Sequence, residues 1–129
     1  MGQLKRFLRG QDGSVTVEYV MWLPILFGFM MLTADATMLL QRQQILQDAA
    51  RDASRQVALG LKTTAEAESE MVARFDTEDD TFTTNVAISG DYVTASISQP
   101  FGDVTIFADS LIGSGALSAE VTMWVEETP

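Results

Sequence analysis

The sequence has no cysteine and no histidine among its 129 residues. Without these residues the chain has no disulfide framework, no thiol nucleophile and no Cys/His zinc site. It also has no histidine to serve as the general base of a serine hydrolase, and no lysine lies near a candidate serine to replace it. We therefore expect a protein that is not an enzyme, with no cofactor and no metal site.

Basic residues are also scarce: eight lysines and arginines stand against eighteen acids, and the formal net charge is −10. Three of the basic residues lie in the first 13 positions beside a single acid, which leaves five basic and seventeen acidic residues in the rest of the chain. A body this acidic should not bind nucleic acid, because phosphate binding needs clustered lysine and arginine. The acidity predicts a solvated surface beyond the N-terminal region.

Apolar residues are concentrated near the N-terminus. Residues 19–32 carry no polar side chain except the Tyr19 hydroxyl, and extending this run to residues 15–34 gives about 20 residues, enough to span a bilayer core of about 30 Å. Glu18 lies near the edge of the run, where its carboxylate can reach the headgroups. The basic start should stay in the cytoplasm and send the C-terminus outward. The sequence therefore predicts a single membrane-spanning helix.

The helical pattern continues beyond the apolar run. Ala34-Asp35-Ala36 fits the cleavage pattern of a secretory signal peptide, but the apolar region is long and the helical pattern passes through it. We therefore expect no cleavage there. Because Asp35 directly follows the apolar run, we interpret it as a marker of the outer membrane boundary. A helix predicted over residues 15–59, capped by Gly60, has one apolar face beyond this point, made by Leu39, Leu46, Ala50, Ala53 and Val57.

A short second helix is predicted over residues 65–75. Thr63 or Thr64 can cap it, and Glu66 follows Thr63 at the spacing of a capping box. Residues 76–80 then form an acidic loop. Its four carboxylates can bind calcium, but the loop lacks the twelve-residue alternation and the glycine of an EF-hand, so we interpret it as a solvated loop.

Three strands complete the chain. Alternating apolar residues on both sides of a Gly90-Asp91 turn predict a hairpin in which Ile88 lies opposite Val93 on one face, and Val86 lies opposite Ala95 on the same face. A last strand should run from Leu117 to about Glu126, with Trp124 on its polar face as a candidate interface residue or a partly covered structural one. Residues 100–115 have both helical and strand spacing, and we favour a short helix or an irregular loop there.

Together these elements predict an α+β fold: a long N-terminal transmembrane and amphipathic helix packed on a small three-stranded antiparallel sheet, with a short second helix. About 60 residues of outer domain make a thin core, so the sheet should bury its apolar face against the amphipathic half of the long helix. The expected organisation is a basic leader at 1–13, a transmembrane helix at 14–35, an amphipathic helix at 36–60 and a small head domain at 61–129.

The segment from Gly13 to Tyr19 resembles a type IV prepilin-type processing site. A short basic leader, Lys5-Arg6-Phe7-Leu8-Arg9, precedes a glycine, and the apolar helix after it has Glu18 as its fifth residue. The Glu-Tyr pair resembles the Tad (Flp) pilus class. Further residues resemble the TadE-like pseudopilins: Leu23-Pro24, Asp35 and Ala49-Ala50-Arg51-Asp52-Ala53-Ser54-Arg55. The resemblance covers residues 6–59 well and the head only in its pilin-like plan.

The resemblance implies a function and a set of partners. A membrane prepilin peptidase would cut between Gly13 and Ser14, and Glu18 and Tyr19 would then serve subunit docking or assembly. The partners implied are membrane lipid, the peptidase, other pilin or pseudopilin subunits and the Tad secretion platform. The implied location is the bacterial inner membrane, with a cytoplasmic N-terminus and a periplasmic head, before any incorporation into an extracellular pilus.

The sequence also departs from the related families. Major Flp pilins are much shorter and lack a head of this size, which favours a minor pseudopilin. Type II secretion pseudopilins usually have phenylalanine where Ser14 lies, and TadE-like proteins often have phenylalanine in place of Tyr19. The alternative from another class is an anchored periplasmic binding or sensor module that is never processed, in which Glu18 simply reaches the membrane interface.

Overall fold

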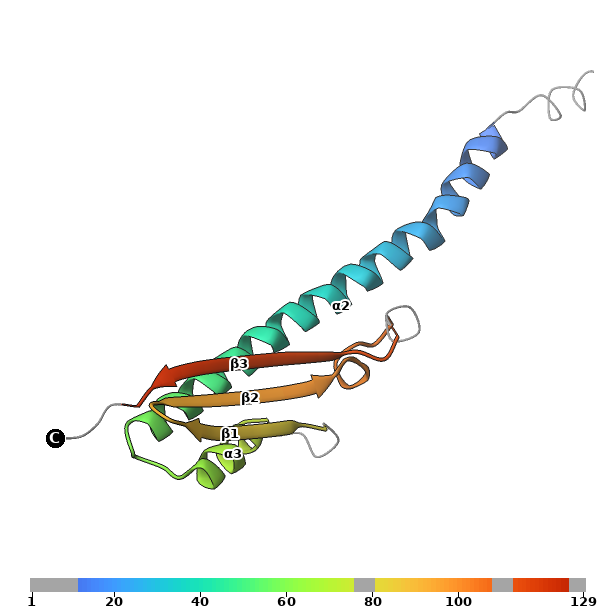
Figure 1. The fold of residues 1–129 in the computed structure, drawn as a ribbon. Helices are drawn as coiled ribbons and strands as arrows, with labels where there is room; N and C mark the ends of the chain where they lie inside the picture. Colours follow the sequence, from blue (N-terminus) through green and yellow to red (C-terminus); the bar gives the residue numbers. More distant parts are fainter. Residues whose placement is uncertain (1–11, 76–80, 108–112, 126–129) are drawn as a thin grey trace, which may run out of the picture. The chain divides into compact units, whose positions relative to one another are not determined.

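The computed structural model describes residues 12–75, 81–107 and 113–125. Its elements are, in order, α2 (Asp12–Ala58), α3 (Thr64–Ala73), β1 (Thr83–Ser89), β2 (Tyr92–Pro100), the 3-10 turn η1 (Phe101–Asp103) and β3 (Ala116–Trp124). The strands form one antiparallel sheet in the order β1-β2-β3 (Figure 1). The predicted α+β fold, with a long helix, a short second helix and a three-stranded sheet, is confirmed. The basic residues of the leader and the acidic loop at 76–80 lie outside the described residues, as does Glu126, the predicted end of the last strand.

Contacts divide the chain into two units, Met1–Ala34 and Asp35–Pro129, and α2 contributes to both. The helix ends where glycine was expected to cap it. Gly60 has a φ of +67°, its N–H donates to the Val57 carbonyl over 2.9 Å, and the Leu61 N–H donates to the Gln56 carbonyl over 2.9 Å. This pair of bonds is a Schellman cap, which satisfies carbonyls that the end of a helix leaves open.

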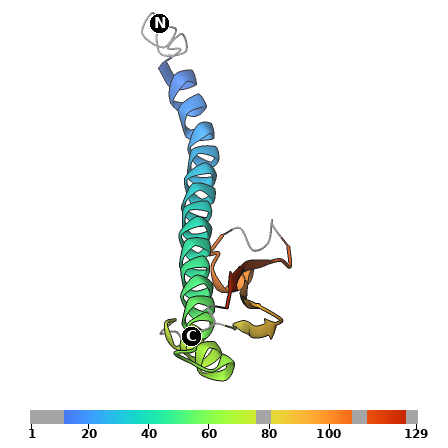
Figure 2. The ribbon, with the colours of Figure 1, turned by 60° about the vertical axis from the view of Figure 1, so that its left-hand side comes forward.

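The core of the second unit lies between α2 and the sheet, which Figure 2 shows along one side of the helix. The predicted apolar face of the helix is confirmed for Leu46, Ala50, Ala53 and Val57, which are buried, and Ala49 and Ala58 join them. Leu39, the first residue predicted for this face, is only partly buried. From the sheet, the buried residues are Val86, Val93, Ala95, Ile97 and Ala119. The buried residues of α2 and of the sheet belong to one core cluster, so α2 supplies apolar surface that the thin sheet lacks.

The hairpin has the predicted register. Gly90, with a φ of +60°, and Asp91 form the turn between Ser89 and Tyr92, and Val86 lies opposite Ala95. Ile88 lies opposite Val93 as predicted, but it is 56% exposed. Ile88 is the next-to-last residue of β1, which is an edge strand. It lies two residues past Val86, whose N–H donates to Glu68 of α3 over 2.7 Å.

Residues 100–115 have both helical and strand spacing, and the sequence favours a short helix or an irregular loop there. In the structure this segment contains the 3-10 turn η1 followed by irregular chain, and residues 108–112 are not described. The Phe101 N–H donates to the Gly115 carbonyl over 2.9 Å, and this bond closes the loop at its base. A Cβ at Gly115 would lie 2.4 Å from the Phe101 ring. Any larger residue at this position would therefore require the Phe101 ring to move, because the ring occupies the space of a side chain.

The first turn of α3 is a complete capping box, and Thr63 rather than Thr64 is the cap. The Thr63 side chain accepts from the Glu66 N–H, and the Glu66 carboxylate accepts from the Thr63 backbone N–H over 2.9 Å. The hydrogen bonds from the Thr63 backbone and side chain lower the pKa of Glu66, and the charge of Lys62 adds to this effect. The helix begins one residue before its predicted start and ends two residues before its predicted end.

Replacing Thr63 by alanine should lower the free energy of unfolding of the head by about 1 kcal/mol at neutral pH, the usual cost of losing such a cap. Because the folded-state pKa of Glu66 is lowered, the contribution of its ionised form is present above the unfolded pKa and is lost as the pH falls through the folded pKa. The difference between the variant and the wild type should therefore shrink in acid. Urea unfolding of the full chain in detergent measures both effects. Thr64→Ala is the control, and an equal loss in both variants would contradict the role of Thr63.

Candidate functional site

The N-terminal part of α2 exposes an almost unbroken apolar surface. Its large side chains expose more than half of their area in the protein alone: Val17, Tyr19, Val20, Met21, Trp22, Ile25, Leu26, Phe27, Phe29 and Met30. Among the described residues, one helix is long and apolar enough to cross a membrane, and the best window has a mean hydropathy of 1.8. Only 6% of that window is buried, whereas the core helix of a soluble protein would be mostly buried.

The four residues expected at the processing and assembly site all lie on this helix. Gly13 and Ser14 fall in its first turn, and Glu18 and Tyr19 follow about one turn later. Glu18 is exposed, and Tyr19 is 69% exposed. Since residues four apart are neighbours on a helix surface, the geometry places position 14 and Glu18 on one side of α2.

Tyr19 lines an apolar hollow on the same stretch of helix. The hollow has a volume of about 260 Å³, and its other lining residues are Trp22, Leu23, Ile25, Leu26 and Phe29. Pro24 lies within this segment and has no N–H to donate to the carbonyl one turn earlier. Proline of this kind is more common in membrane helices than in soluble ones. The surface is therefore suited to lipid tails or to an apolar helix of a neighbouring subunit.

Asp35 has a structural role that the sequence analysis missed. Its side chain is 1% exposed, and its two carboxylate oxygens accept hydrogen bonds from the backbone N–H groups of Ile106 over 3.1 Å and Phe107 over 2.8 Å. Hydrogen bonds to a charged acceptor are about twice as strong as neutral ones. Asp35 therefore fastens the loop after η1 to α2. No sequence signal identifies this contact, because the partners are main-chain groups about 70 positions away.

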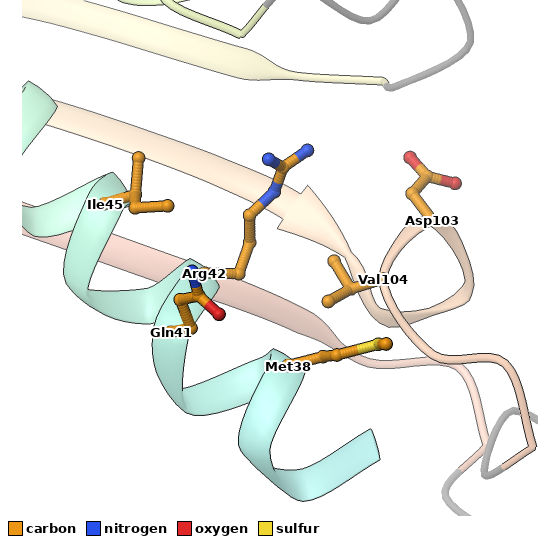
Figure 3. Close-up of a pocket in the computed structure, with 6 residues that line it drawn as sticks. All are labelled: Met38, Gln41, Arg42, Ile45, Asp103 and Val104. Atoms are coloured by element: carbon orange, nitrogen blue, oxygen red, sulfur yellow. The ribbon is translucent and has the colours of Figure 1, made fainter. Parts of the chain in front are cut away.

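A second polar cluster lies further along α2, beside a hollow of about 240 Å³ (Figure 3). Met38, Gln41, Arg42 and Ile45 line it from the helix, and Asp103 and Val104 line it from the turn that follows β2. The Arg42 Nε donates to the Gln99 side chain over 2.8 Å, and its guanidinium lies 5.1 Å from the Phe75 ring centroid. Gln99 is fully buried. These contacts join the helix to β2 and to Phe75, two residues after α3, so the cluster supports the head domain.

The outer face of the sheet ends in an aromatic pair. Trp124 is 59% exposed, and its ring meets that of Tyr92 edge to face with centroids 5.0 Å apart. The sequence predicts Trp124 on this face, either as an interface residue or as a partly covered structural one. In the structure, Tyr92 flanks it on the neighbouring strand and leaves most of the indole accessible.

The family model described as TadE-like protein matches residues 13–55. The match begins at Gly13, includes the exposed apolar segment and Asp35, and ends within the alanine-rich face that packs on the sheet. No curated protein and no solved structure matches the chain. The resemblance predicted from the sequence is confirmed over this range: residues 13–55 match the TadE-like protein family, and the N-terminal hydrophobic stretch of α2 lies within the matched range.

Proposed function

We propose that the chain is a minor pseudopilin that takes part in assembling a Tad/Flp-type pilus, and that it is not an enzyme. The TadE-like match over residues 13–55 carries this proposal, and the exposed apolar surface of the same helix supports it. In this proposal residues 14–35 span the bacterial inner membrane, the leader at 1–13 faces the cytoplasm, and residues 36–60 continue into the periplasm to complete the head at 61–129.

The proposed first step is removal of the leader by a prepilin peptidase, which hydrolyses the peptide bond between Gly13 and Ser14. Cleavage gives Ser14 a free amino group, about one helical turn before Glu18. An ionised carboxylate among apolar side chains is costly in a bilayer, and a nearby ammonium group offsets that cost. The new amine of the same chain or of a neighbouring subunit can supply this partner, so cleavage and docking are linked through Glu18.

The folded head favours a minor subunit over the main filament subunit. The chain has a folded head with a sheet and two helical elements, whereas the major Flp pilins that the sequence resembles are much shorter. The apolar hollow beside Tyr19 gives the helix a surface for the helices of other subunits. The partners in this proposal are membrane lipid, the peptidase, other pilin or pseudopilin subunits and the Tad secretion platform.

Glu18→Gln tests the assembly role. The variant should still be inserted and cleaved, but piliation should fall at least about tenfold, because breaking an ion pair in apolar surroundings costs about 3–5 kcal/mol. Pili are counted by electron microscopy in cells in which the variant replaces the wild type. Glu120→Gln is the matched control, since Glu120 is exposed on β3 and outside the proposed membrane span.

The same cells test the proposed function itself. Wild-type piliation with Glu18→Gln would contradict the docking role of this carboxylate. Removal of the whole chain without any change in piliation or in protein export would overturn the pseudopilin proposal. That result would favour the alternative, an unprocessed membrane-anchored binding or sensor module.

A further inference from the structure

The loop after η1 exposes two neighbouring apolar side chains. Ile106 is 64% exposed and Phe107 is 45% exposed, whereas Thr105, immediately before them, is 8% exposed. Single exposed apolar residues are ordinary on protein surfaces, but two large adjacent ones on a loop are a reason to look for a partner. These two side chains are not used by the proposed processing or docking site.

The backbone that carries them is held at three points. The Asp35 carboxylate accepts from the N–H groups of Ile106 and Phe107. The Thr105 N–H and hydroxyl both donate to the Phe101 carbonyl, over 2.9 Å and 3.1 Å, and the Phe101 N–H donates to the Gly115 carbonyl. Because these bonds hold residues 101–107 in place, this segment presents the two side chains at little additional cost in conformational entropy.

The position of this attachment along the chain is informative. Asp35 directly follows the apolar stretch at 15–34, so the proposed spanning segment ends where the loop is fastened to the helix. The polar interface of a bilayer extends about 5–7 Å beyond the hydrocarbon core on each side. Side chains within about one helical turn of the end of the span, or about 5 Å along its axis, therefore lie at interface depth. Met38, 41% exposed, is one turn beyond Asp35 on the same helix.

We propose that Ile106 and Phe107 insert into the lipid interface of the outer leaflet and form a second membrane contact of the head, with Asp35 holding them there. The charges of the loop indicate which lipid property matters. Residues 101–107 contain no lysine or arginine, and the one acid, Asp103, accepts from the Thr81 N–H over 2.9 Å. The contact is therefore apolar and should not require anionic lipid, in contrast to basic surface helices.

This inference rests on the proposed membrane span, and the test separates the two. The full chain has no cysteine, so a single cysteine introduced at Ile106 or Phe107 carries the only spin label. Labelled protein is reconstituted into phosphatidylcholine vesicles, and label accessibility to oxygen and to a water-soluble nickel complex is measured. Phe29→Cys reports the span, and Ile88→Cys reports an exposed apolar residue at the hairpin end of the sheet.

Labels at 106 and 107 are expected to favour oxygen over nickel, at a depth between those of the labels at 29 and 88, with or without anionic lipid. If the label at 29 lies in lipid while those at 106 and 107 match the one at 88, the inference is overturned and the span stands. If the label at 29 is accessible to nickel, the span and the inference both fail. If the labels at 106 and 107 enter lipid only when anionic lipid is present, the proposal of a purely apolar membrane contact is overturned.

Asp35→Ala provides a second readout in the same vesicles. Without the carboxylate, the label at 107 should move toward the accessibility of the label at 88, while Asp48→Ala, a change at an exposed acid of the same helix, should leave it in place. An unchanged depth in Asp35→Ala would overturn the positioning role assigned to Asp35.

Discussion

Replacing Gly13 by leucine is expected to abolish removal of the N-terminal leader. A peptidase must reach the bond between positions 13 and 14, and glycine leaves the backbone accessible because it has no side chain. A bulky residue beside the scissile bond should displace it in the active site, and a misplacement of about 1 Å slows catalysis by about a hundredfold. Co-expression with a prepilin peptidase, followed by intact mass measurement, gives the processed fraction directly.

The chain offers a matched control three residues upstream. Gly10→Leu makes the same substitution within the leader, away from the proposed bond, and should be processed like the wild type. Loss of processing in both variants would indicate a general effect on membrane insertion. Normal processing of Gly13→Leu would contradict cleavage after Gly13, and with it the link between a new Ser14 amine and Glu18.

Asp35→Ala should destabilise the head by about 2–6 kcal/mol, more than the loss of the Thr63 cap. The substitution removes the charged acceptor of two backbone N–H groups and leaves both donors partly buried without it, and each such loss costs about 1–3 kcal/mol. Asp35→Asn, which keeps an acceptor oxygen, should lose less. Urea unfolding of the detergent-solubilised chain measures the differences.

Asp48→Ala is the control for this series, because Asp48 is an exposed acid on the same helix. Its unfolding free energy should stay within about 0.5 kcal/mol of the wild type, as for most surface substitutions. Equal effects of Asp35→Ala and Asp48→Ala would mean that the two hydrogen bonds contribute nothing to the stability of the head. Wild-type stability of Asp35→Ala would also remove the basis for its positioning role at the membrane.

Much of the head could be predicted because local and long-range signals agree. The Gly90-Asp91 turn and the alternation on both sides of it independently require Val86 to lie opposite Ala95, and the structure has this pair. The spacing of Thr63 and Glu66 specifies a capping box without reference to any other element. The alanines at 50 and 53 predict a closely packed helix face, and both are buried in the core cluster that also contains residues of the sheet.

The remaining features depend on contacts that leave no periodic pattern. The sequence predicts Asp35 as a boundary residue but gives no sign that its carboxylate also accepts hydrogen bonds from main-chain groups of a distant loop. Arg42 and Gln99 meet across a similar distance in the chain, and neither residue alone indicates the other. Ile88 fits the apolar pattern of β1, but its exposure depends on where the core ends, and sequence alternation does not contain that information.

The candidate site also has one part that the sequence predicts and one part that only the structure reveals. The residues from Gly13 to Tyr19 were found from the sequence, because a leader, a glycine and a glutamate at a fixed offset form a local motif, and the TadE-like match includes them. Their roles in cleavage and docking remain predictions. The candidate membrane contact at Ile106 and Phe107 could be identified only from the structure, in which the Phe107 N–H donates to Asp35, the residue that follows the apolar stretch.

The most direct test of the pseudopilin proposal is the N-terminus of the protein purified from its native membranes, determined by intact mass and terminal sequencing. A chain that begins at Ser14 is the predicted result, and it would establish a prepilin-peptidase substrate that keeps its spanning helix. A start beyond Ala36 would mean an ordinary signal peptide and would contradict the membrane anchor. A chain that begins at Met1 or Gly2, in cells with an active peptidase, would contradict the pseudopilin proposal and leave an anchored binding domain.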